Sequence, residues 1–326
     1  MYYDTNSDNG KERMIWLLND HTKTIMGIFD QMKAAGMRQV LAYIDKDPDT
    51  NILKIIDWMI KFNVAGSAHN ADLLNVRAYL SDQNSSWYRL VRSLWTDIDD
   101  GIRKTFFENL VINAGLARQN SKEKSEEDLP MGIMLDQTGN VELNRLPAPV
   151  PLSLNEYDQM IRKNKRKGVF AYIFTGGTDS ITASDLRKLA RVHSDCIFVT
   201  MMKPEEVDSY FADMCFAAQN IAPMIAYENC DEACGMFKAR KLGFGTFCYC
   251  SRENHEELAS GDFVRRMINN GAKLVWIFSS EGENAADQAE SEAVYGRVLS
   301  ARNTEPVLIV DFLHEEKFLG GRISGI

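Results

Sequence analysis

Four cysteines in the second half of the chain are spaced so that their sulfurs could converge. Cys230 and Cys234 follow one predicted strand, and Cys248 and Cys250 end the next. Neighbouring parallel strands end at the same edge of a sheet, so these thiols could surround a single metal ion. Thiolates favour zinc or an iron–sulfur centre. The alternative is that all four are buried thiols that pack as small apolar side chains.

A glycine pair follows the most continuous apolar run of the chain. Residues 169–174, VFAYIF, are typical of a strand that is buried on both faces. The run gives way to Gly176 and Gly177, where the backbone can turn tightly and approach a ligand. Thr182 then predicts the start of a helix. A turn at the carboxyl end of a strand predicts a ligand site, although a purely structural strand–helix connection has the same pattern.

Strand-like and helix-like segments alternate along the chain after residue 130. The predicted strands are 131–135, 169–174, 196–200, 223–227, 245–250, 274–278 and 307–312. The predicted helices are 153–167, 182–193, 204–218, 231–241, 255–270 and 285–302. Strand–helix units in series indicate an α/β fold with a parallel sheet, either doubly wound or bent into a whole or partial barrel.

The carboxyl edge of such a sheet would gather further candidate binding residues. Met201 and Met202 lie near the end of the third predicted strand, Glu228 follows the fourth, and Asp311 lies in the last. Ligands of parallel α/β folds bind at this edge. We therefore expect a ligand-binding rim formed by Gly176, Gly177, Thr178, Met201, Met202, Glu228 and Asp311.

The first 118 residues have a different pattern. Apolar residues recur at helical spacing, and no convincing strand precedes residue 130. Residues 119–128, QNSKEKSEED, are polar and charged and contain no large apolar side chain. The sequence thus predicts an N-terminal helical region over 1–118, a linker over 119–130 and a barrel over 131–326.

Composition excludes some classes of function. The chain has 326 residues and a formal net charge of −9, so it lacks the excess of cations expected of a nucleic-acid-binding protein. No stretch approaches the roughly 20 apolar residues of a membrane span. The first residues, MYYDTNSDNGKER, do not form a signal-peptide pattern. We therefore expect a cytoplasmic protein that binds neither nucleic acid nor membrane.

Several stretches resemble the radical SAM superfamily, in particular a branch with a helical region before the barrel. They are LDQTGNVELN, SLNEYDQMIRKNKRKGVFAYIFTGGTDS, DLRKLARVHSDCIFVT, FGTFCYCSREN and, in the N-terminal region, SWYRLVRSLWTDIDDGIRKTFFENLVINAGLA. The resemblance extends over about residues 70–326. It implies a partial (β/α)6-type barrel with a binding site at the carboxyl ends of the strands.

The chain departs from this family at its catalytic motifs. Active members carry C-x3-C-x2-C after the first strand, and these thiolates hold the 4Fe–4S cluster that cleaves SAM. Residues 137–150 contain no cysteine, and Val141, Arg145 and Ala148 stand at the matching positions. Thr178 replaces the family's glutamate, which binds the amino group of SAM. The resemblance therefore implies that both the cluster and SAM binding are lost.

Three hypotheses follow. The first is a catalytically degenerate, radical SAM-like accessory protein whose barrel mouth binds a peptide substrate or a partner, such as an active radical SAM relative. The second is an enzyme with a relocated metal site on the rim, at the four cysteines. The third is a regulator that binds a small molecule at Gly176 and Gly177.

Overall fold

The protein was analysed as a computed structural model. It describes residues 35–61, 70–114, 116–117, 132–135, 152–250, 254–279, 293–294, 296–298, 300–301, 304–311 and 323–325. The chain divides into two compact units, residues 1–46 and residues 47–326. The described part of the first unit is a helix over residues 35–46. All elements named below belong to the second unit.

The second unit is built on an eight-stranded sheet in which every pairing is parallel. The strands are β1 (Gly132–Leu135), β2 (Ala171–Phe174), β3 (Ile197–Met202), β4 (Ile221–Ala226), β5 (Gly245–Cys250), β6 (Leu274–Ser279), β7 (Leu308–Asp311) and β8 (Ile323–Gly325). They lie in chain order from β1 to β7, and β8 pairs with the free side of β1. This is the order of a barrel in which, among the described residues, β7 and β8 are not paired.

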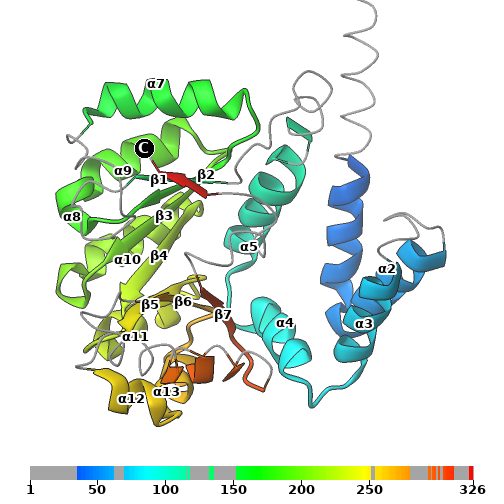
Figure 1. The fold of residues 1–326 in the computed structure, drawn as a ribbon. Coiled ribbons are helices and arrows are strands. Elements are labelled where there is room, and N and C mark those ends of the chain that lie inside the picture. Colours follow the sequence, from blue (N-terminus) through cyan, green and yellow to red (C-terminus); the bar gives the residue numbers. More distant parts are fainter. Residues whose placement is uncertain are drawn as a thin grey trace, which may run out of the picture. The chain divides into compact units, whose positions relative to one another are not determined.

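Helices follow the strands and cover one side of the sheet (Figure 1). They are α7 (Leu154–Lys165), the short α8 (Gly177–Ser180), α9 (Ala183–Val192), α10 (Ser209–Ala218), α11 (Asp231–Ala239), α12 (His255–Ala259) and α13 (Asp262–Asn270). The predicted α/β partial barrel is confirmed. The sequence did not predict β8, because three residues that include a glycine carry no recognisable strand pattern.

Two predicted helices are each interrupted. Residues 204–218 form a 3-10 turn, η3 (Pro204–Glu206), followed by α10. Asp208 begins α10, because its carboxylate accepts a hydrogen bond from the Phe211 backbone N–H at 2.7 Å. Residues 255–270 form α12 and α13, which are separated at Gly261, whose φ is 75°. The cap formed by Asp208 and the left-handed conformation of Gly261 thus each divide a predicted helix into two shorter ones.

The core has two layers because side chains alternate along each strand. In β3, Phe198 and Met202 pack against the helices, whereas Met201 lies on the opposite face of the sheet. The second layer is a buried cluster of Met134, Ile173, Met201, Met224, Phe247, Trp276, Phe278 and Val310. The inner face of the partial barrel is therefore apolar.

The described elements before residue 118 are all helical. They are α2 (Pro48–Lys61), α3 (Asn70–Ser81), α4 (Ser86–Thr96), α5 (Asp100–Phe107) and the π-helix η2 (Glu108–Asn113). The linker predicted over 119–130 lies outside the described residues, and the three-part division of the chain stays a prediction. None of the described helices combines the length and apolar character needed to cross a membrane.

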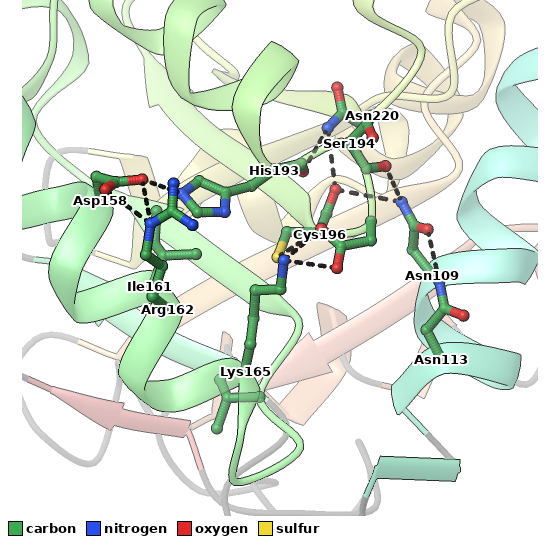
Figure 2. Close-up of polar contacts among 12 residues, drawn as sticks. Asn109, Asn113, Asp158, Ile161, Arg162, Lys165, His193, Ser194, Cys196 and Asn220 are labelled. Atoms are coloured by element: carbon green, nitrogen blue, oxygen red, sulfur yellow. Dashed lines mark hydrogen bonds and ion pairs between the residues drawn. The ribbon is translucent and has the colours of Figure 1, made fainter. Parts of the chain in front are cut away.

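A buried polar network joins η2 to the amino end of β3 (Figure 2). Asn109 in η2 donates from Nδ2 to the carbonyls of Ser194, at 2.9 Å, and Cys196, at 3.3 Å. Asn220, just before β4, donates to the carbonyls of Ala190, His193 and Cys196 at 3.1–3.2 Å. These amides supply hydrogen bonds to backbone groups that water cannot reach.

His193 continues this network toward α7. Its side chain is 1% exposed, and its Nε2 lies 2.9 Å from Oδ1 of Asp158. Burial and the charge of Lys165 lower the pKa of His193, although the contact with Asp158 acts in the opposite direction. Asn109, Asp158, His193 and Asn220, with the backbone groups they contact, are called the amino-edge network below.

Candidate binding site at the barrel mouth

A cavity of about 530 Å³ opens at the carboxyl ends of β2 to β5. We call it the mouth cavity. Its lining residues are Thr175, Gly176, Gly177, Met201, Met202, Lys203, Pro204, Glu205, Glu206, Ala226, Glu228, Asn229, Phe247 and Tyr249. The structure therefore brings together five of the seven predicted rim residues. Its volume lies within the range of small-molecule sites.

Thr178 and Asp311 do not line the mouth cavity. Thr178 faces a smaller cavity of about 180 Å³ near the start of α9. Asp311 is the last residue of β7, at one end of the described strand order, and its side chain lies outside the described part of the chain. The ligand-binding role of all seven residues stays a prediction.

The glycine turn holds a carboxylate from another loop. Oε1 of Glu206 accepts hydrogen bonds from the Thr178 backbone N–H at 2.9 Å and from the Thr178 hydroxyl at 2.6 Å. Oε2 accepts a bond from the Lys203 backbone N–H at 2.7 Å. Gly177 has a φ of 56°, and a Cβ at this position would lie 2.4 Å from Oε2 of Glu206. Glycine is required here because both the backbone conformation and the approach of Glu206 exclude a side chain.

This contact changes what the turn can bind. Two backbone N–H groups and one hydroxyl are the donors that an anionic ligand would use, and Glu206 already occupies them. A second anion would lack these donors and would be repelled by the carboxylate. The turn is therefore unsuited to phosphate or carboxylate ligands while Glu206 is in place.

The mouth cavity has an acidic side. Glu205, Glu206 and Glu228 line it, whereas Lys203 is the only basic residue among the lining residues given above. Partial burial raises the pKa of Glu228, and the charge of Glu257 adds to this shift. A neighbouring cation would stabilise the ionised carboxylate.

The lining of the cavity also includes an aromatic and apolar surface. Tyr249 stacks on Phe278, with ring centroids 5.0 Å apart and an interplanar angle of 28°. Phe247 meets Tyr249 edge to face, with centroids 6.0 Å apart. Met201 and Met202 are both buried and lie close to the acidic loop that follows β3. Such a wall can pack against an apolar side chain and also against a cation.

Three of the four predicted metal-binding cysteines are buried behind the mouth cavity. Cys230, Cys234 and Cys248 pack in the layer between sheet and helices. A hydrogen bond from Cys234 lowers the pKa of Cys230, and the guanidinium of Arg266 contributes to the same shift. Nδ2 of Asn270 also donates to Cys230 Sγ at 3.8 Å. Cys230 thus has polar contacts with Cys234, Arg266 and Asn270.

The described residues contain no group of three or more His, Cys, Asp or Glu side chains suited to hold a metal. The side chain of Cys250 lies outside the described residues, so the four-cysteine site stays a prediction. Metal analysis of the purified protein tests it directly. The cysteine-free residues 137–150 likewise lie outside the part of the chain that the structure describes.

Sequence reasoning missed Glu206, Lys203, Phe247 and Tyr249. The segment Pro204-Glu205-Glu206 was predicted to start a helix, with its acids near the positive end of the helix dipole. Instead, Glu206 reaches the neighbouring strand–helix turn. Its position directly after a strand end was an available signal. Tyr249 could have been found from its alternation with Phe247 along β5, because both then face the inside of the barrel.

Comparison with known proteins gives only distant structural likenesses. No family model and no curated protein sequence matches the chain. SuiB of Streptococcus suis, solved with bound S-adenosylmethionine, matches 59% of this chain and 52% of its own, with 11% identity and a TM-score of 0.41. A type I 3-dehydroquinate dehydratase from Clostridium difficile matches 61% and 84%, with 9% identity and a TM-score of 0.40. The match thus spans about half of the SuiB chain. The fold class stated above rests on this chain's own strand order.

Proposed function

We propose that this protein is a catalytically degenerate, radical SAM-like accessory protein whose mouth cavity binds a peptide segment. The segment would belong to a peptide substrate or to a partner enzyme, such as an active radical SAM relative. The observation that carries this proposal is the mouth cavity itself. It lies at the carboxyl ends of the strands and has a volume of about 530 Å³, and its lining includes Met201, Met202, Phe247 and Tyr249.

The absence of SAM cleavage is the other half of the proposal. Three thiolates are needed to hold the cluster irons, and residues 137–150 provide none. Thr178 cannot replace a carboxylate toward an ammonium group, because a neutral hydroxyl forms a weaker contact than a charged acceptor. The Thr178 hydroxyl is also engaged with Glu206.

A peptide suits this cavity for two reasons. Methionine side chains adapt to apolar partners of varied shape. The acidic side of the cavity also places polar groups beside the apolar wall, and such a combination fixes the orientation of a ligand. Glu206 stabilises the rim by tying the loop after β3 to the turn after β2.

Anaerobic reconstitution tests the lost chemistry. After incubation with iron and sulfide, we expect no 4Fe–4S absorption and no deoxyadenosine from SAM. An active radical SAM enzyme, reconstituted in parallel, provides the positive control. A stable cluster together with deoxyadenosine formation would contradict the proposal.

Hydrogen exchange tests the mouth cavity. A bound peptide should slow exchange at the carboxyl ends of β3 and β5, and Tyr249→Ala should weaken this protection. Tyr210→Ala is the matched control, because Tyr210 is 57% exposed on α10 and does not line the cavity. Protection confined to the N-terminal helices would contradict binding at the mouth.

A small-molecule regulator is the second candidate, and the cavity volume of about 530 Å³ favours it. A thermal-shift screen of metabolites separates the two candidates. A rise in melting temperature that Tyr249→Ala removes, with no effect of peptides, would favour the small molecule.

A further inference from the structure

We propose that the peptide segment bound in the mouth cavity presents a basic side chain, arginine above all, next to a large apolar side chain. This inference rests on the proposed function and specifies its ligand. It follows from the mixed lining of the cavity, which combines carboxylates with aromatic and apolar side chains.

The acidic wall lacks matching positive charge. Of the four charged residues that line the cavity, three are glutamates and only Lys203 is basic. Glu206 has three hydrogen-bond donors, but all of them are neutral groups of Thr178 and Lys203. Its negative charge is therefore stabilised and not cancelled. The charge that remains attracts a cation.

Glu228 lines the same cavity and is exposed there, so a cation can reach its carboxylate. The charge of Glu257 adds to the negative potential at this position. Arg266 also acts on Glu228, but its Nη1 already donates to Glu257 at 3.0 Å and its Nη2 to the Tyr227 carbonyl at 2.8 Å. A ligand cation would supply the counter-charge that Arg266 only partly provides.

The aromatic wall favours arginine over a compact ammonium group. Phe278 and Phe247 both contact the Tyr249 ring, so that ring is held in place. A planar guanidinium can stack on an aromatic ring and donate to a carboxylate at the same time. Met201 and Phe247, which both lie on the inner face of the sheet, then line the cavity for the neighbouring apolar side chain of the ligand.

Fluorescein-labelled hexapeptide mixtures test this inference. Two central positions are fixed as Arg-Leu, citrulline-Leu, Glu-Leu or Arg-Ser, and the other four vary among uncharged small residues. Citrulline keeps the shape of arginine without its charge. Fluorescence polarisation should show Arg-Leu binding about tenfold more tightly than citrulline-Leu or Arg-Ser, and Glu-Leu binding least.

Two matched variants test whether Glu228 causes the preference for arginine over citrulline. Glu228→Gln should reduce the preference for arginine over citrulline to about twofold or less, because it removes one acidic partner of the guanidinium. Glu232→Gln removes an exposed carboxylate on α11 that does not line the cavity, and it should leave the preference unchanged.

The outcomes separate the inference from the function on which it rests. If citrulline-Leu binds as tightly as Arg-Leu and Tyr249→Ala weakens both, the inference of a basic side chain is wrong. The proposal that the mouth cavity binds a peptide then still holds. If no mixture binds, both proposals fail. If free argininamide competes as strongly as the peptide, the ligand is a small amine and the peptide class is wrong.

Discussion

The two ends of the barrel use polar residues in opposite ways. At the amino edge, Asn109, His193 and Asn220 are at most 2% exposed, and their side chains contact fixed backbone or side-chain groups. At the mouth, Glu205 and Glu228 are exposed beside a cavity, and Glu206 relies on neutral donors. Buried hydrogen bonds of the first kind stabilise a fold, whereas exposed carboxylates beside a cavity leave interaction capacity for a ligand. One atom of the amino-edge network, Oδ1 of Asn220, is buried without a hydrogen-bond partner.

This difference follows from the direction of the strands. All strands are parallel, so each end of the sheet gathers one kind of connection. The loops at the carboxyl ends can vary and bind ligands, while the amino edge supports the packing. Substitutions at the amino edge should therefore change stability, and those at the mouth should chiefly change binding.

The largest effect is expected for Asn220→Ala in the amino-edge network. The change removes the donor shared by the carbonyls of Ala190, His193 and Cys196 in a site that is 1% exposed. We expect the free energy of unfolding to fall by about 2–4 kcal/mol, measured by urea denaturation. Glu205→Gln at the mouth is the control and should change it by less than about 0.5 kcal/mol. Equal losses for the two variants would contradict the comparison.

Gly177→Ala tests the close approach of Glu206 to the glycine turn at the mouth. An alanine at this position would have to adopt a φ of 56°, and its Cβ would meet the carboxylate of Glu206. We expect a loss of about 1–3 kcal/mol of stability in urea denaturation. In a double-mutant cycle, Glu206→Ala should recover part of that loss, because it removes the steric conflict. Strict additivity of the two changes would show that Glu206 does not occupy the turn.

A smaller effect at neutral pH is expected for His193→Gln. Burial lowers the pKa of His193 below its usual value of 6.5, so folding favours the neutral imidazole. Stability that depends on this group is present above pH 6.5 and is lost as the pH falls toward the lower folded-state pKa. The change to glutamine keeps a donor for Asp158 but cannot titrate. We therefore expect a shallower loss of stability between pH 7 and pH 5 in the variant.

Asp158, which contacts His193, contributes to stability in a different pH range. Asp158 has its pKa lowered by the guanidinium of Arg162, and its own contribution is lost only at more acidic pH. The two groups therefore act in separate pH ranges. If the parent and His193→Gln proteins lose stability in parallel from pH 7 to pH 5, protonation of His193 does not limit the fold.

The smallest effect is expected for Thr178→Val. The change removes the hydroxyl that donates to Glu206 at 2.6 Å but leaves the backbone N–H bond in place. Because Thr178 is exposed, we expect a loss of only about 0.5–1 kcal/mol in urea denaturation. Thr182→Val is a useful reference, because Thr182 caps α9 in the same segment and should cost about 1 kcal/mol. If Thr178→Val lowers the free energy of unfolding by more than Thr182→Val does, the hydrogen bond from Thr178 to Glu206 stabilises more of the protein than the rim of the cavity.

The sequence predicted most of the barrel and part of the rim. The run at residues 169–174 and the alternation after residue 130 carry strong local patterns, and the strands appear close to the predicted bounds. Gly176, Gly177, Met201, Met202 and Glu228 were predicted at one edge because parallel strands end together, and all five line the mouth cavity. Glu206 was not predicted, since its partner Thr178 lies 28 residues earlier in the chain.

What the sequence alone determined is local and chemical. Apolar periodicity predicts the helices and buried strands, and residues 137–150 contain no cysteine that could ligate iron as a thiolate. Three contacts were decided by tertiary structure alone. The carboxylate of Glu206 occupies the glycine turn, and Tyr249 stacks on Phe278. Asn109 of η2 donates a hydrogen bond to the carbonyl of Cys196. Each of these contacts joins residues far apart in the chain. Their formation depends on strand order and register, which no local pattern specifies.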